Sequence, residues 1–165
     1  MTAVDQILRA FDDAWAHRWE SLGSVCDDVS DEAAYWQAPC YAADEAESGW
    51  PPPGTIAWQV AHVAHCKRHY AAMVRSRKDA EPPPVVPRTP VSGYAAERKA
   101  LEAAHTEQRE AIAAVTDAEL DDMACGKMVL AEFLAMTIRH DTWHAAQIAV
   151  ARRLFRTRPP STEAG

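Results

Sequence analysis

The sequence predicts an all-α protein with four main helices. Its composition favours helices, because apolar residues make up 48% of the chain, glycines number only six and runs of β-branched residues are few. Apolar side chains also recur at spacings of three and four residues over long stretches, which is the period of an amphipathic helix. A proline-rich segment separates two of these stretches, so we expect a long connection between them.

The length and the net charge of the chain limit the classes of protein to which it can belong. At 165 residues the chain is most simply one domain, which we expect to span residues 1–158 and to be followed by a flexible tail at 159–165. The net charge of −7 argues against a nucleic-acid partner, since neutralising phosphates requires a basic surface. No apolar run approaches the ~18 residues of a membrane span, so we expect no membrane partner.

The cysteines and the start of the sequence indicate a compartment. The four cysteines are widely spread and form no CxxC pair. The first residues do not show a basic segment followed by an apolar one, the pattern of a secretory signal. We therefore expect a soluble cytoplasmic protein with reduced thiols. The cysteines are Cys26, Cys40, Cys66 and Cys125.

The first long helix should span residues 2–25. Thr2 and Asp5 resemble a capping box at its start. A short helix around residues 30–36 should follow, and Thr55 is a suitable N-cap for a second long helix that ends near residue 77. The apolar residues of the first helix that recur at helical spacing are Val4, Ile7, Leu8, Phe11, Trp15, Trp19 and Leu22.

The segment 81–90 cannot be helical, because proline lacks the backbone donor and clashes with the preceding turn. Polyproline-like chain advances about 3.1 Å per residue, so about 15 residues can travel the ~30 Å length of a 20-residue helix. The second helix and a third one, expected over 92–115, can therefore run parallel and be joined by a crossover.

A fourth helix should span residues 129–155. Thr116 and Glu119 resemble another capping box, which opens a short turn of helix before it. Pro159 and Pro160 then stop the fourth helix. The positions that alternate by four and three and should face the other helices are Phe133, Thr137, His140, His144, Gln147, Ala151 and Leu154.

The histidines of the second and fourth helices predict a metal site. His140 and His144 lie four residues apart, so on a helix they stack one turn, about 5.4 Å, above each other and can reach one cation. His62 lies among small apolar residues on the second helix and is the expected third ligand. For His65 and His69 we favour a solvated flank beside Lys67 and Arg68. Three imidazoles and an open position are typical of a catalytic zinc-type site, although imidazole also suits nickel, iron and cobalt.

These residues resemble a known family. The stretch 55–64, TIAWQVAHVA, resembles the second helix of the DinB-like (YfiT-type) superfamily, which carries its first metal histidine at the position of His62. The stretch 140–148, HDTWHAAQI, resembles the last-helix signature of that superfamily, with Asp141 where many members have glutamate. The resemblance implies a four-helix bundle with up-down-down-up topology, which agrees with the crossover expected above. It also implies that His62, His140 and His144 hold one divalent metal ion, zinc or nickel first and iron, cobalt or manganese as alternatives.

The resemblance further implies a class of activity. Members of the superfamily with known activity include S-transferases that use low-molecular-weight thiols and a thiol-dependent isomerase. A metal that lowers the pKa of a bound thiol or water would generate the nucleophile. We therefore expect a thiol and an electrophile as partners, and a homodimer, which is common in the superfamily. The alternatives are a non-catalytic metal-binding stress or sensor protein, a metal-dependent hydrolase or isomerase, and a bundle without functional metal.

Three further residues have more than one interpretation each. Gln147 either orients a histidine or the bound ligand, or makes a hydrogen bond between helices. Cys66, one turn after His62, is a fourth ligand, a resolving thiol or, as we prefer, a small buried hydrophobe. His105 on the third helix either approaches the site or makes a structural hydrogen bond, and we favour the second. Trp58 and Trp143 flank the proposed ligands and can form the walls of a substrate pocket.

Overall fold

The structure, a computed structural model, describes residues 1–19, 21–39 and 47–159. It is mostly helical over these residues, as the composition and periodicity predicted. The predicted tail, 159–165, lies outside the described residues except for Pro159. The elements are α1 (Ala3–Ala16), α2 (Leu22–Val25), α3 (Asp31–Tyr35), α4 (Ile56–Arg75), α5 (Tyr94–Ala113), η2 (Asp117–Glu119), β1 (Met123–Ala124), β2 (Met128–Val129) and α6 (Leu130–Thr157).

Local capping chemistry fixes most helix starts. Thr2 and Asp5 form the predicted capping box, in which the Thr2 hydroxyl accepts from the Asp5 amide at 3.0 Å. The Thr55 hydroxyl accepts from the amide of Trp58 at 3.1 Å and so caps α4 as predicted. Thr116 and Glu119 form the second predicted capping box, at the 3₁₀ turn η2.

The prediction of one helix over residues 2–25 is wrong. α1 ends at Ala16, and a separate helix, α2, begins after Ser21, whose hydroxyl accepts from the Ser24 amide at 3.3 Å. Gly23 lies so close to the chain of α1 that a Cβ there would be 2.6 Å from the carbonyl oxygen of Trp15. The chain therefore turns back on α1 instead of continuing it.

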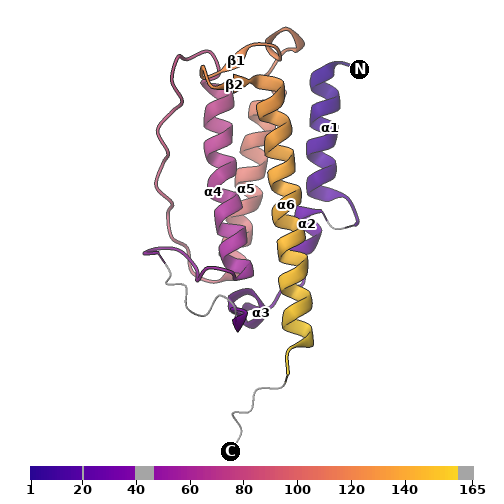
Figure 1. Cartoon of the computed structure of the whole chain (residues 1–165), viewed down its shortest axis with the longest axis vertical. Helices are drawn as coiled ribbons and strands as arrows, with labels where there is room; N and C mark the ends of the chain where they lie inside the picture. Colours follow the sequence, from indigo (N-terminus) through magenta and orange to yellow (C-terminus); the bar gives the residue numbers. More distant parts are fainter. Residues whose placement is uncertain (20, 40–46, 160–165) are drawn as a thin grey trace, which may run out of the picture.

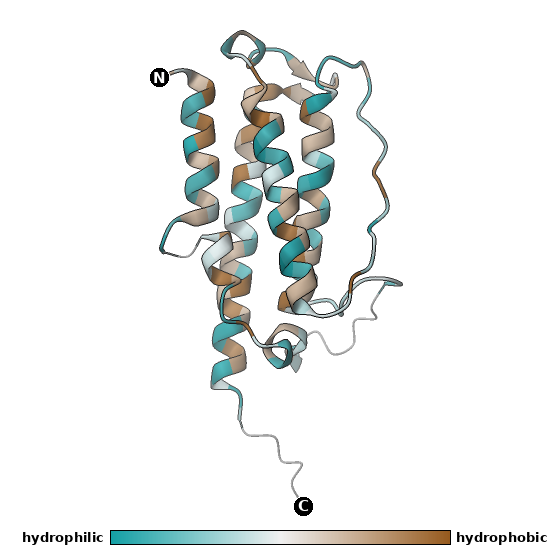
Figure 2. Cartoon of the chain, turned by 180° about the vertical axis from the view of Figure 1, so that it is seen from behind, coloured by the Kyte–Doolittle hydropathy of each residue, from teal (hydrophilic) through white to brown (hydrophobic). Residues whose placement is uncertain are grey.

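The four long helices α1, α4, α5 and α6 lie side by side (Figure 1). In this view α4 and α5 run in the same direction, α1 and α6 run the opposite way, and residues 76–93 return along the outside of α4. Each long helix carries both hydrophilic and hydrophobic residues along its length (Figure 2). Their apolar residues form two buried clusters, one near α2 and α3 and the other toward the β1–β2 end.

The hairpin of β1 and β2 before α6 was not predicted. Its two strands pair antiparallel, with Met123 opposite Val129 and Ala124 opposite Met128. Cys125 and Gly126 form the turn with φ of 48° and 64°. Strands of two residues are too short to leave an alternating pattern in the sequence.

Within the described residues, none of the helices combines the length and the apolar character that crossing a bilayer requires.

Candidate metal centre

α4 and α6 bring the three predicted ligands together. The ring centroid of His62, on α4, lies 5.5 Å from that of His140 and 4.9 Å from that of His144, both on α6. The rings of His140 and His144 are 4.4 Å apart and nearly perpendicular. The i, i+4 spacing on α6 and the facing position on α4 therefore bring the three rings close together. His144 is not part of the group of described residues whose potential ligand atoms all lie within 4.8 Å of one another.

The nitrogen atoms of the α6 pair face each other. Nε2 of His140 lies 3.1 Å from Nε2 of His144. Two nitrogens bound to one tetrahedral zinc, each at about 2.0–2.1 Å, lie roughly 3.3 Å apart. The separation of this pair thus fits two ligands of one cation closely. Nδ1 of His140 is buried and finds no hydrogen-bond partner within the described part of the chain.

Gln59 fixes the orientation of His144. Nδ1–H of His144 donates a hydrogen bond to Oε1 of Gln59, which lies one turn before His62 on α4. This contact puts the proton of the neutral ring on Nδ1 and leaves a lone pair on Nε2, the atom that faces His140. Gln59 was not predicted from the sequence. The sequence feature that could have revealed it is a polar side chain within the apolar run before His62, three residues from that histidine.

Cys66 also lies at this point. Its Sγ is 3.5 Å from Nε2 of His62, and one potential ligand atom each from His62, Cys66 and His140 lie within 4.8 Å of one another. Burial raises the pKa of the Cys66 thiol to about 11. Without a metal it is therefore a thiol at neutral pH, whereas coordination would require the thiolate. Cys66 is thus within reach of the candidate metal, and without a metal it is an uncharged, largely buried thiol.

Burial keeps the three histidines neutral. Burial first, and the neighbouring histidines after it, lower the pKa of His140 to about 4 and that of His144 to about 3. The pKa of His62 is lowered for the same reasons, burial first and the nearby His65 second. A neutral imidazole offers a lone pair to a cation, so the electrostatics of the site suit metal binding at neutral pH.

Aromatic rings enclose the histidines. The ring of Trp58 stacks on His62 with centroids 4.9 Å apart and an interplanar angle of 6°. Tyr70 meets His140 edge-on at 5.6 Å. Such apolar neighbours exclude water from one side of the site and strengthen interactions with a cation.

A buried ion pair joins the two helices next to the histidines. Nζ of Lys67 lies 2.5 Å from Oδ2 of Asp141, and both side chains are almost fully buried. Nζ also donates to Oε1 of Gln108 at 3.2 Å. Burial lowers the pKa of Lys67 and raises that of Asp141, while each charge counteracts the effect on its partner. The flank expected beside His65 and His69 is therefore not solvated at Lys67, whose charge is matched by an aspartate that the histidine pattern did not reveal.

The other histidines stand apart from this group. His65 and His69 are half-buried, and His65 meets the ring of Trp50 edge-on at 5.6 Å. His105 is buried between the parallel rings of Phe11, at 4.6 Å, and Trp15, at 4.0 Å. None of the described residues makes a hydrogen bond to its Nδ1, so stacking holds the ring in place of the expected hydrogen bond at that atom.

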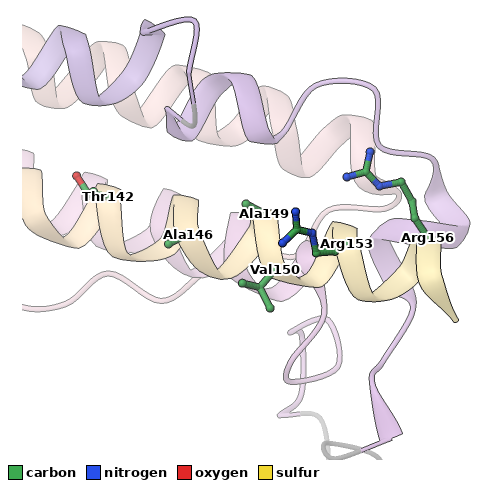
Figure 3. A pocket seen from close by; sticks show the side chains of 6 residues that line it. All are labelled: Thr142, Ala146, Ala149, Val150, Arg153 and Arg156. Carbon is green, nitrogen blue, oxygen red and sulfur yellow. The ribbon is translucent and has the colours of Figure 1, made fainter.

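Among the hollows that border α6, two lie toward its C-terminal end. One, of about 470 Å³, includes Gln59, Trp143 and Gln147 in its lining and so adjoins the histidines. The other, of about 420 Å³, contains none of the candidate ligands (Figure 3). Its lining consists of Thr142, Ala146, Ala149, Val150, Arg153 and Arg156.

These features define a helical protein with a candidate site for a divalent metal between two of its long helices. The chain belongs to the DinB superfamily, whose pattern matches residues 10–148. This confirms the resemblance seen in the second and fourth predicted helices. No curated protein and no solved structure matches the chain.

Proposed function

We propose that His62, His140 and His144 hold one divalent metal ion, and that the protein is a metal-dependent S-transferase for a low-molecular-weight thiol. The observation that carries the metal site is the facing pair of Nε2 atoms of His140 and His144, 3.1 Å apart, with Gln59 fixing the ring of His144. Zinc and nickel are the first candidates and iron, cobalt and manganese follow, since all accept imidazole.

The proposal includes the topology of the chain and its setting. The four long helices form an up-down-down-up bundle, with residues 76–93 as the crossover between α4 and α5. A cytoplasmic location supplies the reduced thiol, and a homodimer is the expected assembly.

The chemistry follows from the ligand set. His62, His140 and His144 would hold the divalent ion through neutral imidazoles, and the ion would supply the charge that lowers the pKa of a bound thiol. The thiol gives its proton to water, the sulfur forms a bond to the electrophilic carbon, and the leaving group departs with the electrons of the bond that breaks. Gln59 holds the ring of His144, and Trp58 shields the face of His62 from water.

A second function is favoured by one contact. If Cys66, 3.5 Å from His62, is a fourth ligand, it closes the site, and a closed site is typical of a structural or sensing metal. The protein would then be a non-catalytic metal-binding stress or sensor protein. With the position open and water in place of the thiol, the same ligands would serve a hydrolase or isomerase.

The first experiment measures the metal content of protein purified without a metal-affinity tag. We expect about one metal ion per chain in the wild type, and its loss in His62→Ala and His144→Ala with the helical signal retained. Cys66→Ala is the matched test of the closed site, and we expect it to keep its metal. Loss of the metal in Cys66→Ala with retention in His144→Ala would overturn the ligand set.

The second experiment tests the transfer. Wild-type protein loaded with metal should accelerate the reaction of a low-molecular-weight thiol with an electrophile. The His144→Ala variant should not accelerate this reaction. A metal-loaded protein that accelerates neither this transfer nor a hydrolysis would favour the sensor function.

A further inference from the structure

The hollow of about 470 Å³ beside the histidines has the size of a small-molecule site. Ligand pockets commonly measure about 300–1,000 Å³. Its walls come from parts of the chain far apart in sequence: Trp36 after α3, Gln59 on α4, and Trp143 and Leu154 on α6. A pocket assembled from three elements is a property of the fold rather than of one exposed loop.

Two glutamines connect this pocket to the candidate metal centre. Gln59 lines it and accepts the hydrogen bond from His144. Gln147 lines it as well, and its Oε1 is buried with no hydrogen-bond partner among the residues that the structure describes. A buried carbonyl oxygen without a donor is costly, by about 1–3 kcal/mol, so a ligand that donates to it would gain from the contact.

The outer wall of the pocket is apolar and exposed. Trp143, Val150 and Leu154 are 65%, 59% and 46% exposed although they are large hydrophobic side chains. They follow one side of α6 at spacings of seven and four residues. The opposite wall is the ring of Trp36, held edge-on against Phe155 with centroids 5.9 Å apart. Covering such side chains gains about 25 cal/mol per Å² of apolar surface.

Among the described residues, the lining includes no charged side chain, and its side-chain amides are those of the two glutamines. An ionised ligand would lose its hydration without gaining an opposite charge, which is expensive. We propose that this pocket binds the uncharged, largely apolar body of the electrophile, an aromatic or alicyclic small molecule, with a hydrogen-bond donor directed to Gln147. This inference rests on the proposed S-transferase function for the identity of the ligand as the electrophile.

The test compares two dyes that share one ring skeleton. N-phenyl-1-naphthylamine is uncharged, and 8-anilinonaphthalene-1-sulfonate adds one sulfonate. We expect the wild type to bind the uncharged dye at least tenfold more tightly, measured by the rise of dye fluorescence. Equal binding, or tighter binding of the sulfonate, would overturn the proposal.

Matched variants locate the binding site. Val150→Asp and Leu154→Asp place a charge on the outer wall and should weaken binding of the uncharged dye at least tenfold. Val86→Asp makes the same change at a valine that is 72% exposed in the segment 76–93, and should leave binding unchanged. Equal dye binding in Val150→Asp and Val86→Asp would contradict the assignment of the pocket.

Two further measurements separate this inference from the proposed function. His62→Ala should lose the metal but keep the dye, because His62 does not line the pocket. Dye binding in a wild type that never holds metal would support the pocket and remove the S-transferase, whereas metal without dye binding would remove the pocket alone. A wild-type dimer that Val150→Asp converts to a monomer, with no dye bound by either, would show that the wall is a subunit interface and overturn the inference.

Discussion

Gln59 decides which nitrogen of His144 carries the proton. Because its Oε1 accepts from Nδ1–H, the lone pair of the ring lies on Nε2, beside Nε2 of His140. Removing such an oriented acceptor typically lowers metal affinity about 10–100-fold. We expect this loss in Gln59→Leu, measured by competition with a chromophoric chelator.

Gln59→Glu is the control for this prediction, since a carboxylate keeps the acceptor and should restore most of the affinity. Unchanged affinity in Gln59→Leu would mean that the helices alone hold His144 in place.

His105 makes the stability of the protein depend on pH. Burial, and then the charge of Lys67, lower its pKa from the ordinary 6.5 to about 3, so the folded protein holds this ring neutral. Between these values the unfolded chain binds a proton that the folded chain does not. The contribution of the neutral His105 ring to the stability of the folded protein is therefore intact above about pH 6.5 and is lost progressively as the pH falls toward 3.

His105→Phe should reduce this dependence, because phenylalanine keeps a flat ring between Phe11 and Trp15 but takes up no proton. We expect the free energy of unfolding of the variant to fall less steeply between pH 6.5 and pH 4, as measured by urea unfolding of metal-free protein. The difference between the two slopes should correspond to at most one proton per chain. Identical slopes in the two proteins would show that His105 already titrates normally when folded.

At the scale of helices, the Lys67–Asp141 pair connects α4 to α6 one residue away from Cys66 and His140. Removing one partner of a buried pair leaves the other charge without compensation, at a cost of about 3–5 kcal/mol. Asp141→Leu should lower the free energy of unfolding by this amount in urea titrations of metal-free protein.

The double variant Lys67→Met with Asp141→Leu removes both charges and should recover most of the stability, since apolar residues of similar volume often replace a buried pair without loss. If the double variant is no more stable than Asp141→Leu, the cost comes from packing rather than from the unpaired lysine.

The boundaries of the long helices could be predicted because local chemistry sets them. The predicted ends of α4, α5 and α6 agree with the structure to within two residues. The break after Ala16 could not be predicted in the same way, since it depends on the contact of Gly23 with the Trp15 carbonyl, between two elements. The 3.6-residue period of the apolar side chains continues across the break and hides it.

In the candidate site too, the contacts within one helix could be predicted, whereas the contacts between helices could not. His140 and His144 share a helix, so their spacing alone placed them together. The contacts of Gln59 and Lys67 cross from α4 to α6 and depend on how far one helix is shifted along the other. That shift results from packing across the whole interface between the two helices, so it cannot be predicted from the sequence pattern of either helix alone.

At the scale of the whole molecule, the proposed up-down-down-up bundle requires that residues 76–93 reach from the end of α4 back to the start of α5. The 20 residues of α5 give that helix a length of about 30 Å. The 18 residues of the connection can span about 56 Å in extended polyproline-like form, which leaves slack. Most of the segment 81–87 is exposed, so few contacts depend on it.

Deletions of two lengths therefore test the topology. Removing residues 82–87 leaves 12, enough for about 37 Å, and should change the free energy of unfolding by less than about 1 kcal/mol. Removing residues 78–87 leaves eight, which reach only about 25 Å, and should destabilise the protein by several kcal/mol or prevent folding. Both deletions keep Arg77, which pairs with Glu119, and Arg88, which pairs with Glu97.

A chain in which ten glycine and serine residues replace 78–87 is the control, because it keeps the length and changes the sequence. It should fold like the wild type if the length of the connection, and not its sequence, determines whether the chain can fold. Circular dichroism and urea unfolding measure all three variants. If α4 and α5 were instead antiparallel, their joined ends would lie close together, and the ten-residue deletion would be as stable as the six-residue one. That result would overturn the crossover, whereas a sharp difference between the two deletions would establish it.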